Sequence, residues 1–182
     1  MSTLTHDEEF VFLEKDGLLA IEIESAPLAG EWAFETALTG YTGKGYYTWK
    51  GPNLFTTPGQ GILTYKFYVT NPGEYKLFIY NRHDHPDRTE NNDAWIKVNN
   101  AKWLKTYSSE NCEWTWQTKY EFSHGNRGHA VNTLEEGLNV IQISGRSTDF
   151  SIARLVFCQD ADKGMDLSVE ESPRVKVSDL KK

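Results

Sequence analysis

The sequence has 182 residues, the length of one domain with a substantial core. Its net charge of -7, with no basic run before the last two residues, excludes nucleic acid as a partner, because phosphate binding needs clustered Lys and Arg. Its apolar runs are too short to span a bilayer, and we expect no membrane partner. The first residues lack the charged and then apolar pattern of a secretory signal.

The chain reads as a succession of short β-strands separated by Gly, Pro and Asn turns. Apolar and polar residues alternate most clearly in residues 62–70, and the turn Asn71-Pro72-Gly73 predicts a hairpin between this segment and residues 74–80. No segment keeps a 3.6-residue repeat over the length of a helix. The predicted strands are residues 11–13, 18–25, 46–50, 62–70, 74–80, 94–98, 103–107, 114–122, 138–144 and 150–158. This spacing is typical of an all-β antiparallel sandwich of the jelly-roll type.

The density of predicted strands divides the chain into three parts. Residues 1–9 are polar, and we expect a flexible N-terminal segment there. Residues 10–158 contain all the predicted strands and form the β-sandwich. Residues 159–182 are mostly polar with acidic clusters, which is typical of a C-terminal extension or linker.

The two cysteines, Cys112 and Cys158, are far apart in the sequence. Their spacing leaves open whether they form a disulfide or remain separate thiols. The chain has no Cys-x-x-Cys pattern, so a zinc site of that type is excluded.

Two carboxylates share one face of the predicted strand at residues 18–25. Glu22 and Glu24 lie opposite the apolar face, and like charges side by side repel unless water, a cation or a basic residue offsets them. They form either a solvated outer face or part of a calcium site, which needs further oxygen ligands from elsewhere.

The polar residues 81–93 raise the alternative of a metal-dependent enzyme. His83, His85 and Glu90 have the spacing His-x-His-x4-Glu, which resembles the first metal motif of cupins, themselves jelly rolls. The motif is incomplete, because the glycines that flank it in cupins are absent here. A histidine and acid cluster in a polar loop is more often a hydrogen-bonding scaffold, and that alternative stays open.

Aromatic residues gather near the glycine-rich loops. Sugars present apolar C–H faces, so proteins that bind them offer flat rings beside hydrogen-bonding groups. A sandwich core also buries large rings, and we expect Trp95 and at least one of Trp114 and Trp116 to be buried. The candidate rings are Tyr41, Tyr46, Tyr47, Trp49, Trp114 and Trp116.

The order of several motifs resembles carbohydrate-binding module family 6 and its relatives, which include family 35 and the malectin-like domains. The motifs are AIEIES, GKGYYTWKG, GILTYKFYVTNPGEYKLFIYN with its Pro-Gly-x-Tyr turn, WTWQTKYEF, EEGLNVIQISG and FSIARLVF. The resemblance covers residues 18–157 and implies a jelly-roll β-sandwich with no catalytic activity.

The resemblance also implies where a ligand binds. The main cleft of family 6 lies among the loops at one edge of the sandwich. By position its aromatic residues correspond to Tyr46 or Tyr47 and to Trp114 or Trp116. The polar contacts of the last loop correspond to residues 147–149, with Ser147 and Asp149 as candidates.

A structural calcium ion is the cofactor that the resemblance implies, held by Glu22 and Glu24. An Asp of the final strand completes this site in the family, but Ala153 and Arg154 stand there. Arg154 could pair with the glutamates instead.

The function expected from these features is non-catalytic binding of a polysaccharide or oligosaccharide. Such modules direct an appended polysaccharide-degrading enzyme to its glycan, so the resemblance implies an extracellular or cell-surface location within a larger multidomain protein. As an isolated module the domain is expected to be a monomer. Arg82 and Arg88, in a loop that the family pattern does not explain, suggest an acidic or sulfated glycan. The alternatives are the cupin-like enzyme and an interaction domain for another protein.

Overall fold

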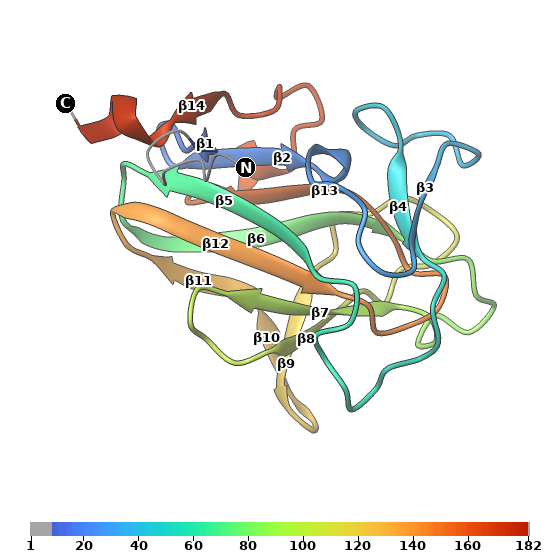
Figure 1. Cartoon of the computed structure of the whole chain (residues 1–182). Coiled ribbons are helices and arrows are strands. Elements are labelled where there is room, and N and C mark those ends of the chain that lie inside the picture. Colours follow the sequence, from blue (N-terminus) through green and yellow to red (C-terminus); the bar gives the residue numbers. More distant parts are fainter. Residues whose placement is uncertain (1–8, 182) are drawn as a thin grey trace, which may run out of the picture.

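The computed structural model describes residues 9–181 and shows two β-sheets packed face to face (Figure 1). The larger sheet has the strand order β10 (Asn126–His129), β9 (Lys119–Ser123), β8 (Leu104–Tyr107), β7 (Asp93–Val98), β12 (Gly137–Ser144), β5 (Leu63–Val69), β1 (Phe10–Leu13) and β14 (Arg174–Lys176). The smaller sheet has the order β11 (Val131–Leu134), β6 (Gly73–Arg82), β13 (Ser151–Cys158), β4 (Tyr46–Trp49) and β3 (Trp32–Glu35), and β2 (Leu18–Glu22) also pairs with β13.

Helical structure is restricted to single turns in the described part of the chain. These are α1 (Ala161–Gly164) and the 3-10 turns η2 (Ile23–Ser25) and η3 (Val177–Lys181). No helix in residues 9–181 is long and apolar enough to cross a membrane. All strand pairs are antiparallel except β1 with β5. The predicted all-β antiparallel sandwich is confirmed.

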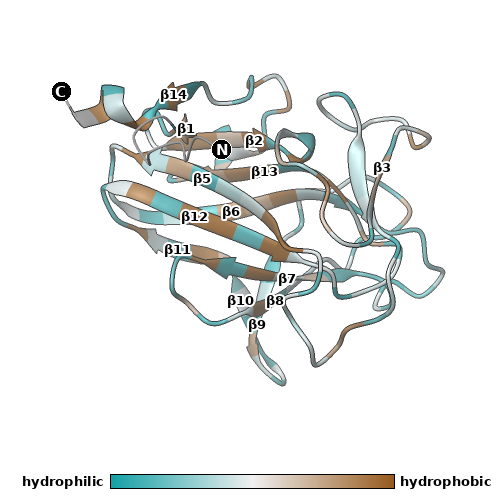
Figure 2. Ribbon diagram, viewed as in Figure 1, coloured by the Kyte–Doolittle hydropathy of each residue, from teal (hydrophilic) through white to brown (hydrophobic). Residues whose placement is uncertain are grey.

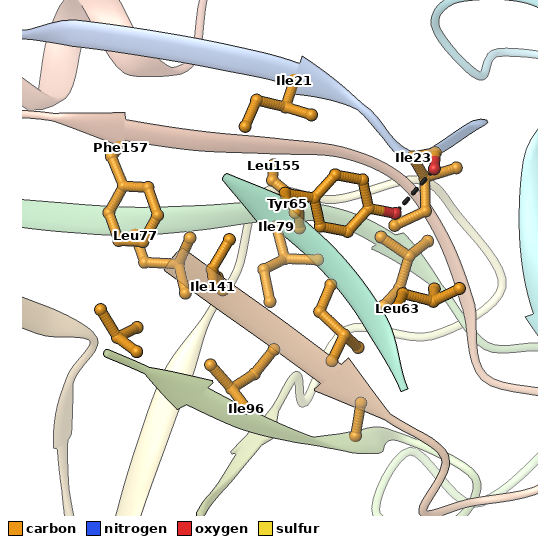
Figure 3. Packing of buried hydrophobic residues seen from close by; sticks show 14 of the residues in the cluster. Ile21, Ile23, Leu63, Tyr65, Leu77, Ile79, Ile96, Ile141, Leu155 and Phe157 are labelled. Atoms are coloured by element: carbon orange, nitrogen blue, oxygen red, sulfur yellow. Dashed lines mark hydrogen bonds between the residues drawn. The ribbon is translucent and has the colours of Figure 1, made fainter. Parts of the chain in front are cut away.

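The core lies between the two sheets and follows from the alternation of each strand. Every second residue of β5 is buried, and the hydropathy of β12 alternates along the strand in the same way (Figure 2). Tyr65 is 2% exposed and donates its hydroxyl hydrogen to the carbonyl oxygen of Ile23, at 2.7 Å (Figure 3). Its phenol therefore joins the apolar core without leaving its polar atom unpaired.

The predicted hairpin of residues 62–80 is wrong. β5 pairs with β12 and β1 in the larger sheet, whereas β6 pairs with β13 and β11 in the smaller one. The turn at Asn71 therefore carries the chain from one sheet to the other. The alternation of both strands correctly places one face of each in the core, but a face directed at the core does not specify the sheet to which a strand belongs.

The predicted strand at residues 114–122 is also mostly wrong. Only its last part belongs to β9, which begins at Lys119. Before that, Thr115 and Asn81 form a single antiparallel bridge, with N–O distances of 2.9 and 3.0 Å. The side-chain amide of Asn81 donates to the carbonyl oxygen of Gln117 at 3.0 Å. This segment therefore crosses β6 near its end and covers it. The hydroxyl oxygen of Thr118 also accepts a hydrogen bond from the backbone amide of Ile79 in β6.

The residues after Cys158, which were expected to form an extension or linker, pack against the sandwich. β14 pairs with β1 in the larger sheet, and Ser172 bonds the backbone of Ala20 through both its amide and its hydroxyl. Glu171 accepts a hydrogen bond from the amide of Glu22 at 2.9 Å. This segment thus contacts both sheets. Of the expected flexible segment at residues 1–9, residues 1–8 lie outside the described residues.

The two cysteines are free thiols. Cys158 is 1% exposed and packs in a small apolar cluster with Ala20 and Val156, whereas Cys112 is exposed. Burial, with the nearby Asp160, raises the pKa of Cys158 to about 11, so this thiol remains protonated at neutral pH.

Candidate functional site

The outer face of the smaller sheet is covered by the glycine-rich loop of residues 38–45 and by residues 113–118. Between these covers and the sheet lies an aromatic cluster, which we define as Tyr41, Tyr46, Tyr80, Trp114 and Trp116. Trp114 stacks on Tyr80 with 5.4 Å between the ring centres, and Trp116 lies 4.7 Å from the same ring. The cluster is a second, smaller core outside the sandwich.

The polar atoms of this cluster hold the glycine-rich loop in place. The hydroxyl of Tyr80 donates to the carbonyl oxygen of Gly40 at 3.2 Å, and the indole nitrogen of Trp114 donates to the carbonyl oxygen of Thr39 at 3.1 Å. The hydroxyl oxygen of Tyr46 accepts from the amide of Leu38 at 3.1 Å. These rings are therefore engaged in packing the loop onto the sheet.

The expectation that Tyr46 or Tyr47 displays a ring to a ligand does not agree with their burial. Tyr46 is 1% exposed under the loop, and Tyr47 is 4% exposed in the main core, where its hydroxyl donates to the carbonyl oxygen of Ala26 at 2.7 Å. Successive residues of β4 point to opposite faces, and both faces are covered. Trp114 and Trp116 are half-buried and each keep part of their surface accessible.

A polar pocket of about 220 Å³ opens beside the aromatic cluster, where β4 and β6 end and β13 begins. Thr48, Arg82 and Ser151 occupy outward positions of these three strands and form its floor. The loop residues Lys50 and Asp149 form part of its wall. We call it the loop-edge pocket, and its lining residues are Glu35, Leu38, Thr48, Lys50, Arg82, His83, Asp84, Asn91, Asp149 and Ser151.

The charges in the loop-edge pocket are paired. Lys50 lies 3.2 Å from a carboxylate oxygen of Glu35 and 3.1 Å from one of Asp149, and Arg82 lies 2.8 Å from one of Asp84. Burial, the largest influence, lowers the pKa of Lys50, but the hydrogen bonds to the two carboxylates outweigh it, and the pKa lies above its ordinary value. Lys50 is therefore a charged donor at neutral pH.

Hydroxyl groups and a histidine complete the polar lining. The hydroxyl of Thr48 donates to Glu35 at 2.7 Å and lies 2.8 Å from that of Ser151. His83 is 1% exposed, its Nε2 lies 3.1 Å from the carbonyl oxygen of Arg88, and its Nδ1 has no hydrogen-bond partner within residues 9–181. Burial lowers the pKa of His83, which favours the neutral ring. His83 thus lines the pocket, and its unpaired ring nitrogen is itself buried.

Ser147 and Asp149, the candidates in the last loop, have different environments. Asp149 is exposed, adopts a positive φ of 63° and lines the loop-edge pocket. Ser147 is 2% exposed, and its hydroxyl donates to the buried carboxylate of Asp93, which also pairs with Arg146. Ser147 therefore fixes the shape of the loop, and only Asp149 is placed to contact a ligand.

Glu22, the first candidate calcium ligand, is paired with Arg154. The Nε and Nη2 atoms of Arg154 donate to the same oxygen of Glu22, at 2.9 and 2.6 Å, and both side chains are nearly buried. The other oxygen of Glu22 accepts from the hydroxyl of Thr42 at 2.6 Å. The guanidinium group thus supplies the positive charge that Glu22 needs.

Glu24, the second candidate ligand, is less completely satisfied. One oxygen accepts from the amide of Lys44 at 2.6 Å, and the other is buried with no hydrogen-bond partner in the described part of the chain. Burial, and then the charges of Glu22 and Glu171, raise the pKa of Glu24. Residues 9–181 contain no group of three or more His, Cys, Asp or Glu side chains placed to hold a metal ion.

That finding also bears on the cupin-like alternative, which is not favoured. His83 is buried against the backbone of its own loop, and Nδ1 of His85 accepts from the amide of Asp87 at 3.0 Å. Glu90 is exposed, and its amide donates to the carbonyl oxygen of Asp87. The histidines and acids of this loop order its turns, so the region is a hydrogen-bonded scaffold.

Sequence reasoning missed Thr48, Ser151 and Lys50 in the loop-edge pocket. The signal was present, because Thr48 and Ser151 are polar residues within otherwise apolar strands, and their register pairs them directly across β4 and β13. Polar residues at adjacent outward positions where strands end indicate a site.

No protein-family model matches the sequence, and no curated protein matches it. Solved structures do match. A β-(1,4)-mannanase of Podospora anserina with family 26 and family 35 domains (GH26-CBM35) has a TM-score of 0.58 and 21% identity, over 81% of this chain and 28% of the mannanase.

Isolated modules match over nearly their whole length. A family 35 carbohydrate-binding module of Clostridium thermocellum has a TM-score of 0.56 and 17% identity, over 76% of this chain and 97% of the module. A family 35 module of Cellvibrio japonicus has a TM-score of 0.53 and 18% identity, over 79% of this chain and 94% of the module. The chain has the β-sandwich fold of the family 35 carbohydrate-binding modules.

Proposed function

We propose that this domain binds carbohydrate without catalysing a reaction, and that the loop-edge pocket receives the sugar. The fold shared with family 35 carbohydrate-binding modules supports the first part of the proposal. The observation that carries the second part is the pocket itself, which brings together donors and acceptors from three strands and the last loop.

The chemistry of the pocket suits sugar hydroxyl groups. Each cation is already paired with a carboxylate, so the lining offers a dense set of polarised donors and acceptors without an unpaired positive charge. A hydroxyl can donate to Asp149 or Glu35 and accept from Lys50. A neutral sugar therefore suits this pocket better than an acidic one.

The size of the pocket points to a single sugar unit. Its volume of about 220 Å³ lies below the range of roughly 300–1,000 Å³ that is typical of drug-sized ligands. A chain end or one residue of a polysaccharide is the unit that the pocket would hold. Leu38 lines the pocket and packs with the aromatic cluster. We therefore propose that Trp114, a half-buried ring of this cluster, supplies a stacking contact through its accessible surface.

The proposed biological role is to direct an attached enzyme to its polysaccharide. The mannanase of Podospora anserina carries a region of this fold beside a catalytic domain, and this chain spans 28% of that protein. By analogy, we place the domain in a larger protein that acts outside the cell or at its surface, with the isolated domain as a monomer.

A structural calcium ion at Glu22 and Glu24 remains a proposal. The unpaired oxygen of Glu24 supports it, and the guanidinium of Arg154 argues that the required cation is already supplied. Thermal unfolding of the full chain with calcium chloride or with a chelator decides between the calcium ion and Arg154 as the source of positive charge. An unfolding temperature raised by calcium would support the ion. Equal unfolding temperatures would mean that Arg154 alone offsets the glutamates.

Affinity electrophoresis in native gels against a panel of neutral and acidic polysaccharides tests the proposed function. We expect at least one neutral polysaccharide to retard the chain. Thr48→Ala and Asp149→Ala should weaken this retardation, because both remove groups from the pocket. Glu74→Ala, an exposed residue of β6 outside the pocket, is the matched control. No retardation by any polysaccharide would contradict the proposal.

A further inference from the structure

The buried carboxylate of Asp93 lies between two loops that both line the loop-edge pocket. Asp93 begins β7 and directly follows the loop of residues 83–92, which supplies three of the lining residues. The last loop, which joins β12 to β13 as residues 145–150, supplies Asp149. Asp93 itself is not part of the lining, so any effect that it has on the pocket passes through these loops.

Three hydrogen bonds tie Asp93 to the last loop. The hydroxyl of Ser147 donates to one carboxylate oxygen, and Nη1 of Arg146 donates to the other. The backbone amide of Ser147 donates to the carbonyl oxygen of Asp93 at 3.2 Å. Asp93 is 3% exposed, so these bonds are shielded from water and are costly to leave unmade. The last loop is therefore fixed two residues before Asp149.

The guanidinium of Arg146 is also held from the outer face of the larger sheet. It lies 5.0 Å from the ring centres of both Phe55 and Trp95. We expected Trp95 to be buried, and it is instead half-buried on the outer face. The alternation of β7 explains this position, because Ala94 and Ile96 are 1% exposed and face the core. Two rings and a carboxylate thus set the position of the guanidinium.

Asp93 also belongs to a row of alternating charges that crosses the larger sheet. Its carboxylate lies 3.5 Å from the ammonium group of Lys105, which lies 2.9 Å from the carboxylate of Glu121. Glu121 in turn lies 3.6 Å from Arg127. These residues belong to β7, β8, β9 and β10, which run side by side (Figure 1). The carboxylate that holds the last loop is thus itself held by the sheet.

Thr148, the next residue of the last loop, makes bonds of a different kind. Its amide donates to the side-chain oxygen of Asn53 at 2.9 Å, and its hydroxyl donates to the carbonyl oxygen of Gly51 at 2.7 Å. Asn53 and Gly51 lie in the loop after β4, so these bonds join one loop to another. The bonds of Asp93 instead connect the last loop to a strand of the larger sheet.

The anchored end of the last loop bears on the position of Asp149. This residue has a positive φ of 63°, a backbone conformation that persists only where the surrounding chain holds it. Its amide donates to the carbonyl oxygen of Trp49 at 2.8 Å, and its carboxylate accepts from Lys50 at 3.1 Å. On the other side of Asp149, the chain is held by the bonds to Asp93.

We propose that Asp93 is a positioning residue of the loop-edge pocket. Through Ser147 and Arg146 it holds the last loop in the arrangement that presents the carboxylate of Asp149 to a sugar, and it does not touch the sugar itself. This inference rests on the proposed function, because it assumes that the loop-edge pocket binds a sugar. It assigns a binding role to a residue outside the pocket.

Affinity electrophoresis of the full chain with galactomannan, arabinoxylan and a soluble β-glucan tests the effect on binding. Asp93→Asn preserves the size of the side chain but removes the charge that Arg146 pairs. We expect about tenfold weaker binding, the effect of losing one hydrogen bond to a charged group in the pocket. Ser147→Ala, which leaves all charges in place, should weaken binding in the same direction by about threefold. It also provides the test if Asp93→Asn fails to fold, which circular dichroism shows.

A double-mutant cycle distinguishes positioning from a general loss of structure. A residue that acts through Asp149 has little left to affect once the carboxylate of Asp149 is gone. Asp93→Asn should therefore weaken binding by less than about twofold in the Asp149→Ala background. Glu121→Gln is the matched control, because it removes a charge from the same row without a bond to the last loop, and it should leave the affinity unchanged. Additive losses, or an equal loss in Glu121→Gln, would overturn the inference.

Amide hydrogen exchange of the chain without any sugar tests the same arrangement. In Asp93→Asn, the amides of Ser147 and Asp149 should exchange about tenfold faster, whereas those of β5 and β12 in the core should keep their rates. Equal acceleration in the last loop and in the core would mean that Asp93 supports only the global fold. That result would overturn the inference.

The inference and the proposed function fail separately. If no polysaccharide retards the unchanged chain, the proposed function fails, and hydrogen exchange still decides whether Asp93 holds the last loop. If the unchanged chain binds a polysaccharide and Asp93→Asn binds it as tightly, the positioning role is overturned and the proposed function stands.

Discussion

The outer faces of the two sheets use aromatic residues in opposite ways. On the smaller sheet the rings lie beneath the glycine-rich loop and residues 113–118, and their polar atoms bond the loop backbone. On the larger sheet the ring of Phe55 is 50% exposed and that of Trp95 is half-buried, and both lie beside the guanidinium of Arg146. Aromatic content alone therefore does not locate a binding surface, because the path of the loops decides which rings are covered.

The covered face also explains the charges near Glu22. Arg154 points outward from β13, and the chain that covers this face leaves both partners of the ion pair nearly buried. A buried pair is costly to break, because the remaining charge has lost its water. The comparison thus predicts that substitutions on the covered face of the smaller sheet lower the unfolding free energy strongly. Substitutions on the open face of the larger sheet should lower it only slightly.

The largest loss should follow Arg154→Ala. Removing the guanidinium leaves the buried carboxylate of Glu22 unpaired, which should cost about 3–5 kcal/mol of unfolding free energy. Urea unfolding measures this loss. The double variant Glu22→Gln with Arg154→Met should recover part of it, and a single variant as stable as the unchanged chain would show that the pair is not buried as described.

Tyr46→Ala should destabilise the domain by a similar or slightly smaller amount, about 3–4 kcal/mol. The ring is 1% exposed and packs between Tyr41 and Trp114, so truncation leaves a cavity beneath the loop. Urea unfolding again gives the value. A loss below about 1 kcal/mol would mean that the loop does not cover this face, and Tyr46 would return as a ligand-binding candidate.

Glu14→Gln should cost about 1–3 kcal/mol and should change the dependence of stability on pH. Glu14 is 1% exposed and accepts hydrogen bonds from Gly17, Thr70 and Asn71 at the crossover between the sheets. Burial, the largest influence, raises the pKa of Glu14, but the hydrogen bonds from Asn71, Thr70 and Gly17 together lower it below the ordinary 4.5.

The sign of the pH effect follows from this lowered pKa. The contribution of Glu14 is fully present above about pH 4.5 and is lost as the pH falls through the lower pKa of the folded state. Unfolding free energies measured between pH 7 and pH 3 should therefore fall less steeply in the Gln variant. Parallel curves for the two proteins would contradict the assignment.

The smallest effect should follow Phe55→Ala on the open face. The ring is 50% exposed, so its loss should change the unfolding free energy by no more than about 0.5 kcal/mol. Urea unfolding of this variant beside Tyr46→Ala compares the two faces directly. A loss as large as that of Tyr46→Ala would show that the exposed ring supports the fold as much as the covered one.

The sequence predicts the fold class well, because alternation and turn residues are local signals. It does not predict that β5 and β6 belong to different sheets, since both bury one face in the same core. The pairing of β14 with β1 was also missed, because a three-residue edge strand in a polar segment has almost no hydrophobic pattern.

The candidate site is predictable only in part. The last loop was expected to face a ligand, and Asp149 does line the loop-edge pocket. The burial of Tyr46 was not predictable, because it depends on the path of the glycine-rich loop that covers this ring. Trp95 was expected in the core, and the neighbouring apolar residues of β7 show in hindsight that it must face outward.

The central claim is that the loop-edge pocket binds a sugar, and an NMR titration of the isotope-labelled full chain tests it most directly. The ligand is an oligosaccharide of the neutral polysaccharide that retards the chain most. The account predicts that amide shifts gather at Thr48, Arg82, Asp149 and Ser151. Shifts confined to other parts of the sandwich, or none with any glycan of the panel, would contradict it.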